Sequence, residues 1–183
     1  MDWTDGWMPR WQFAEVHHIR SRASPAALLD AAQARDPDDD PLLRVALGLR
    51  ESPGRLAAAL GLSSALVGRP RFGKADFLPL GRLGDEALAY GLIGRFWEPG
   101  YGLLPQADAA AFRAFQGPGV AKLLLAFEAR ADGDASRITT LSRLVCADAP
   151  TRRRMALYWT LIRPVSGLIR RRLLAQIKRV AEA

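Results

Sequence analysis

The sequence predicts an α+β domain in which a curved antiparallel sheet wraps around one long C-terminal helix. Apolar residues in the last 35 positions recur at the spacing of one buried helical face. Upstream, several segments alternate with a period of two between turn signals, which is typical of half-buried strands. No repeat or linker divides the 183 residues, so we expect one domain with a substantial core.

The N-terminal half begins with an arm over residues 1–12 that carries three tryptophans, and we expect it to pack on a domain spanning residues 13–183. A strand is predicted over residues 13–19, and Ser24-Pro25 starts a helix that runs to about residue 34. Two more helices are predicted over residues 42–50 and 55–60. The aspartates at positions 36–40 lack the glycine and the final glutamate of a calcium loop, so we read Asp40-Pro41 as a helix start.

The C-terminal half reads mainly as hairpins. Strands are predicted over residues 77–83 and 86–97, joined by a turn at Gly84-Asp85. A short helix over residues 108–115 precedes a second hairpin formed by residues 118–130 and 136–148. The terminal helix follows, and it contains nine basic residues and one acidic residue. Arg163-Pro164 predicts a kink in that helix, because proline removes one helical hydrogen bond.

Composition excludes several classes of protein. A single cysteine, Cys146, allows no internal disulfide, and we expect it to be a small buried side chain. The N-terminus lacks the pattern of a secretory signal, so a cytoplasmic protein is expected, and no run is long enough to span a membrane. His17 and His18 lack a third ligand, so no metal site is predicted, and no cofactor motif occurs. The net charge of +7 comes mostly from arginine without a nucleic-acid motif, so nucleic acid is not the expected partner.

Four segments resemble a bacterial family of START-like domains of unknown function, within the helix-grip (SRPBCC) superfamily. They are EVHHI (residues 15–19), GLIGRFW (91–97), FxxFxxPGxAK (112–122) and YWxLIRPxSGLIRR (158–171). The resemblance implies a sheet of about seven strands curved around the terminal helix, with a cavity between them. Related domains sometimes follow a Rossmann-type oxidoreductase domain, so it also implies a reductase as a partner. One departure is residues 140–143, which read TLSR where the family pattern has TETR.

The candidate ligand-binding residues come from the last strands and the terminal helix. Tyr158, Trp159 and Ile162 lie on the apolar face of the helix, where core packing and ligand contact can coincide. Arg95 and Arg143 are candidates to orient a ligand carboxylate or carbonyl, and Trp97 continues the strand of Arg95. These roles require that the strands point the arginines inward, and a one-residue bulge would reverse them.

We therefore expect a cavity that binds a small apolar or amphipathic molecule. An alternative is an interaction module that docks its basic helix on a partner protein or on an anionic membrane, since arginine triplets flank the proline. A cyclase- or hydrolase-like enzyme is a second alternative, although no nucleophile motif is present. The sequence identifies no catalytic residue.

Overall fold

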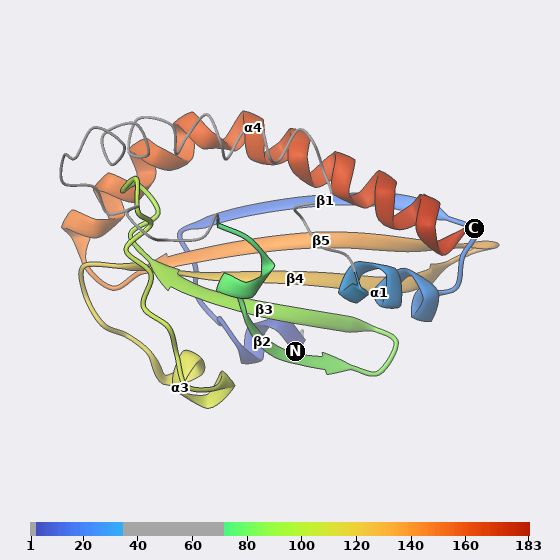
Figure 1. The fold of residues 1–183 in the computed structure, drawn as a ribbon, viewed down its shortest axis with the longest axis horizontal. Helices are drawn as coiled ribbons and strands as arrows, with labels where there is room; N and C mark the ends of the chain where they lie inside the picture. Colours follow the sequence, from blue (N-terminus) through green and yellow to red (C-terminus); the bar gives the residue numbers. More distant parts are fainter. Residues whose placement is uncertain (1–2, 35–71) are drawn as a thin grey trace, which may run out of the picture.

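The computed structural model describes residues 3–34 and 72–183. The predicted helices over residues 42–50 and 55–60, and the aspartates at 36–40, lie outside these ranges. The described residues form an α+β fold of one antiparallel sheet with helices on it (Figure 1). Its elements, in chain order, are η1 (Trp3–Gly6), β1 (Phe13–Ser21), α1 (Pro25–Ala34), η3 (Lys74–Asp76), β2 (Leu78–Leu83), β3 (Ala87–Gly94), α3 (Ala109–Ala114), β4 (Ala121–Asp132), β5 (Ala135–Cys146) and α4 (Ala149–Ala181).

The sheet has five strands in the order β1-β5-β4-β3-β2, and every neighbouring pair is antiparallel. All five strands were predicted from the period of two. The resemblance implied about seven strands, whereas the described residues form five. The predicted strand over residues 86–97 is shorter than expected, because β3 ends at Gly94 and a turn follows.

Polar side chains start each helix where the sequence predicted. Ser24 Oγ accepts a hydrogen bond from the Ala27 amide at the start of α1. Asp108 accepts one from the Ala111 amide at the start of α3, and Asp148 accepts one from the Thr151 amide at the start of α4. These carboxylates satisfy amides that have no partner within the helix. Helix α4 then continues without interruption for 33 residues, with Pro164 inside it.

The two faces of the sheet are covered by different elements. We call the face that contacts α1 and α4 the inner face, and the opposite one the outer face. On the outer face, the N-terminal arm and α3 bury Trp7, Met8 and Phe112 against Ile93 and Leu124. The arm is thus packed on the sheet, as the sequence predicted.

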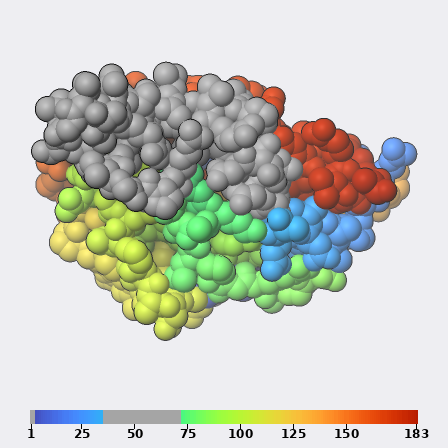
Figure 2. All heavy atoms as spheres, viewed as in Figure 1, coloured from blue at the N-terminus to red at the C-terminus, as the bar shows by residue number. Residues whose placement is uncertain are grey.

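Helix α4 arches over the inner face and packs closely against the sheet near its two ends (Figure 1). At its start, Met155 joins a buried cluster with Leu92 and Leu144. Towards its end, Leu174 and Ile177 join a second cluster to which α1 contributes; α1 lies beside this part of α4 in Figure 2. The middle of α4 lies between these clusters.

Candidate functional site

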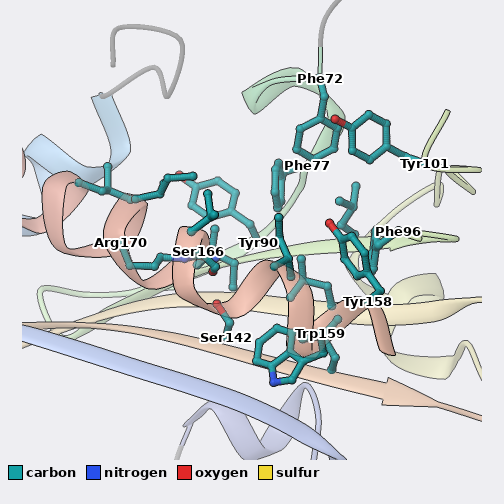
Figure 3. Close-up of a pocket in the computed structure, with 18 of the residues that line it drawn as sticks. Phe72, Phe77, Tyr90, Phe96, Tyr101, Ser142, Tyr158, Trp159, Ser166 and Arg170 are labelled. Atoms are coloured by element: carbon teal, nitrogen blue, oxygen red, sulfur yellow. The ribbon is translucent and has the colours of Figure 1, made fainter. Parts of the chain in front are cut away.

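A cavity of about 610 Å³ lies between the middle of α4 and the inner face of the sheet. Its volume is in the range of pockets that bind small molecules. The lining is mostly apolar, with contributions from α1, η3, all three central strands and the segment after β3. Figure 3 shows these side chains converging on one space. From α4, the lining residues are Met155, Tyr158, Trp159, Leu161, Ile162, Val165, Ser166, Ile169, Arg170 and Leu173.

One end of the cavity is aromatic, and we call it the aromatic end. Phe72 stacks on Tyr101 with ring centroids 4.5 Å apart, and it meets Phe77 edge-on at 5.6 Å. Phe96 and Tyr158 lie at the same end (Figure 3), close to the buried cluster at the start of α4. This end offers an apolar and well-defined wall.

Three hydroxyl-bearing or charged side chains gather at the opposite end, which we call the polar end: Ser142, Ser166 and Arg170 (Figure 3). Ser142 lies on β5 in register with Leu125 of β4, and Leu125 pairs with Tyr90 of β3. Side chains in one such row share a face. The hydroxyls of Ser142 and Tyr90 have no hydrogen-bond partner among the described residues, although Ser142 is only 4% exposed.

Arg170 brings a positive charge to the polar end. Its Nη1 donates to Thr140 Oγ1 at 3.3 Å, and its other N–H groups have no partner within the described residues. Burial lowers the pKa of this guanidinium to about 10, and the nearby charge of Glu15 opposes that effect. It remains charged at neutral pH. Arg171 and Arg172 are exposed, whereas the Arg170 side chain lines the cavity.

Glu15 on β1 joins the sheet to the middle of α4. One carboxylate oxygen lies 2.7 Å from His17 Nε2, and the other accepts a hydrogen bond from Ser166 Oγ at 2.9 Å. Gly167 makes this approach feasible, because a Cβ there would lie 3.0 Å from Glu15 Oε1. His18 points the other way and is exposed, as strand alternation requires.

The order of groups in this cluster is not that of an activated serine. The carboxylate lies between the hydroxyl and the imidazole, so His17 does not contact Ser166, as a general base would have to. Among residues 3–34 and 72–183, no group of three or more His, Cys, Asp or Glu side chains could hold a metal ion. The arrangement can accept a small molecule and offer it hydrogen bonds and the positive charges of Arg170 and Lys74.

The structure brings three of the predicted site residues together, since Tyr158, Trp159 and Ile162 all line the cavity. Trp97 does not line it, and instead packs beside the cluster at the start of α4. Whether the three lining residues contact a ligand stays a prediction.

The two arginines predicted to orient a ligand do not reach the cavity. Arg143 lies on the outer face, where its Nη1 donates to Asp5 at 2.7 Å and its guanidinium lies 3.8 Å from the Trp11 ring centroid. Arg95 lies after the end of β3 and is exposed, with its Nε donating to the Gly119 carbonyl oxygen. Both placements follow from strand alternation and from the early end of β3.

Gly91 likewise lies on the outer face, so the missing side chain leaves no room in the cavity. A Cβ there would lie 2.6 Å from the Phe112 ring. Tyr90, Ser142 and Arg170 also line the cavity, and no local pattern in the sequence indicated this. Ser142 and Arg143 are consecutive residues of one strand, so their side chains lie on opposite faces of the sheet. Knowing the face of one would have given the face of the other.

A second hollow of about 590 Å³ lies beside η3, β2 and residues 103–106. Pro79, Pro105 and Gln106 contribute to its lining, together with Phe112. Its charged lining residue, Asp76, accepts a hydrogen bond from the Gly73 amide, and its lining is less apolar, so the cavity under α4 is the better candidate site.

Comparisons with known proteins leave this site without a precedent. No family model matches the chain, and no match was found among curated proteins or solved structures. Within the described residues, no helix has the length and apolar character that crossing a membrane requires.

Proposed function

We propose that this protein is a START-like, helix-grip domain that binds a small apolar or amphipathic molecule in the cavity under α4. The observation that carries the proposal is a mostly apolar space of about 610 Å³ between α4 and the inner face of the sheet. Empty apolar space costs van der Waals contacts that a tighter packing would gain. A ligand that fills the cavity would recover those contacts.

The test uses a neutral fluorescent probe, N-phenyl-1-naphthylamine, whose emission rises in apolar surroundings. We expect saturable binding with one probe per chain. Leu125→Trp adds a large ring to the cavity wall and should abolish binding while the domain stays folded. Val16→Trp is the matched control, because Val16 is 54% exposed and its side chain points away from the inner face. Non-saturable binding, or equal binding by both variants, would refute the proposal.

A second candidate function is docking on an anionic membrane by the exposed side of α4. Leu157, Leu161 and Leu168 are 69%, 71% and 48% exposed, and their spacing places them on one side of the helix. Exposed arginines precede and follow these leucines, at positions 152–154 and 171–172. Apolar side chains flanked by arginine are typical of helices that lie at a membrane surface.

Vesicle sedimentation tests this second candidate. The wild-type chain should sediment with vesicles of phosphatidylcholine and phosphatidylserine, and much less with phosphatidylcholine alone. Replacing Leu157 and Leu168, which do not line the cavity, by serine should weaken this binding without affecting the probe in the cavity. Absence of sedimentation with both kinds of vesicle would contradict membrane docking, and would leave a partner protein as the occupant of this helix side.

A further inference from the structure

The cavity differs in chemistry from one end to the other, and this difference constrains the ligand. Aromatic rings line one end, and the charged group Arg170 lies at the other with the hydroxyls of Ser142 and Ser166 (Figure 3). On α4, Tyr158 and Arg170 are 12 residues apart, which corresponds to about 18 Å along a helix. A ligand that spans the cavity would therefore present different groups at its two ends.

We propose that the cavity takes an anionic amphiphile, an aliphatic carboxylate whose head group pairs with Arg170 and whose chain lies towards the aromatic end. This inference rests on the proposed function, because it names the class of ligand for the same cavity.

The polar end provides more hydrogen-bond donors than the described residues use. Arg170 makes one hydrogen bond, to Thr140, and the Ser142 hydroxyl makes none with the described residues. Thr140 and Ser142 are two residues apart on β5 and share the inner face, so they are separated by about 7 Å. A carboxylate between them would accept hydrogen bonds from both Arg170 and Ser142.

The carboxylate of Glu15 does not already fill this role. Its two oxygens are occupied by His17 and Ser166, and it reaches Arg170 only through longer-range attraction. That attraction keeps the guanidinium charged without satisfying its N–H groups. A charged donor of this kind in an apolar cavity favours an anion over a neutral group.

Lys74 is the other cation on the cavity lining, and it is a weaker candidate. Its Nζ donates to the backbone carbonyl oxygen of Gln33. It belongs to η3, between Phe72 and Phe77, and so lies beside aromatic rings. Replacing it separates the effect of this charge from that of Arg170.

The experiment measures how well dodecanoate and 1-dodecanol displace N-phenyl-1-naphthylamine. The two competitors share a chain and differ in the head group. We expect dodecanoate to displace the probe from the wild-type chain at a concentration at least about tenfold lower, since a hydrogen bond to a charged group is worth that much. Arg170→Gln should remove this preference, and Arg170→Lys should keep part of it.

Two controls make the result specific. Arg171→Gln removes the same charge as Arg170→Gln, but from an exposed neighbour, and Lys74→Gln removes the other cation on the cavity lining. Both variants should keep the preference for dodecanoate. Equal displacement by acid and alcohol in the wild-type chain would overturn the head-group inference while leaving the proposed function intact. A preference that survives Arg170→Gln, or that is lost with Lys74→Gln, would overturn it as well. Failure of the probe to bind the wild-type chain would instead refute the proposed function.

Discussion

The two faces of the sheet are both apolar, yet they are covered differently: a cavity lies between the inner face and α4, whereas the arm and α3 pack directly on the outer face. The outer face is covered by short segments, the arm and α3, whose side chains fit between those of the strands. Phe112 occupies the space left by Gly91, and Arg113 lies 4.4 Å from the Trp7 ring centroid. The inner face is covered by α4, a single helix of 33 residues that packs closely at both ends.

The difference teaches that the cavity lies where α4 arches over the sheet between its two packed ends (Figure 1). A helix of this length extends for about 50 Å and cannot follow a twisted sheet at every point. It therefore rests on Met155 at one end and on Leu174 and Ile177 at the other. Glu15 and Gly167 add a polar contact with β1 in between. The space that remains is the cavity, and its walls are mostly apolar.

The sharpest test of this comparison uses two neighbouring leucines of β4. Leu124 is fully buried on the outer face, whereas Leu125 lines the cavity. We expect Leu124→Ala to lower the free energy of unfolding by about 2–5 kcal/mol, because it creates a new void in a packed region. Leu125→Ala should cost less, roughly 1–2 kcal/mol, since it only enlarges an existing space. Denaturant unfolding of both variants measures the difference, and equal losses would mean that the inner face is packed after all.

Adding one methyl group to each face tests the same difference in the opposite sense. In Gly91→Ala the new Cβ would lie 2.6 Å from Phe112, so we expect a loss of about 1–3 kcal/mol in unfolding free energy. Ser142→Thr adds a methyl on the cavity wall and should change the free energy by less than about 0.5 kcal/mol. Thermal melting of the two variants is the measurement. A stabilised Gly91→Ala would show that the ring of Phe112 moves freely.

The sequence predicted the helices and strands well, but it predicted poorly which face of the sheet each side chain occupies. The period of two identified all five strands, and the Ser24-Pro25 cap located the start of α1. Which face each residue occupies depends on registers and on where a strand ends, and neither is encoded locally. Arg143 was expected inside, but its partner Asp5 comes from the N-terminal arm, 138 residues away.

The part of the candidate site that could be predicted from the sequence is the part that lies on a single helix. The helical period placed Tyr158, Trp159 and Ile162 together, because neighbours on a helix face are set by local spacing alone. Tyr90 and Ser142 come from different strands and meet only through the pairing of β3, β4 and β5. Arg170 looked like one of three surface arginines, since the sequence does not show which member of the triplet points inward.

The last and smallest effect concerns Lys122, a buried cation on the outer face. It is 7% exposed, its Nζ donates to the Arg113 carbonyl oxygen, and it lies 4.6 Å from the Phe112 ring centroid. Burial, with a smaller contribution from the charge of Arg113, lowers its pKa to about 8. The lysine pKa in an unfolded chain is about 10.4, so between pH 8 and 10 the folded state binds fewer protons than the unfolded state. Stability should therefore rise with pH across this range by an amount on the order of 1 kcal/mol.

Lys122→Met supplies the control, because it keeps the length of the side chain and removes the titration. Cys146 opposes the trend at higher pH, since burial raises the pKa of its thiol to about 11 and the folded state then retains a proton that the unfolded state loses. The comparison is therefore the difference in unfolding free energy between wild type and variant, measured at several values from pH 7 to 9.5. That difference should shift in favour of the wild type as the pH rises. A constant difference would show that Lys122 titrates normally, and that solvent reaches the outer face more freely than its packing indicates.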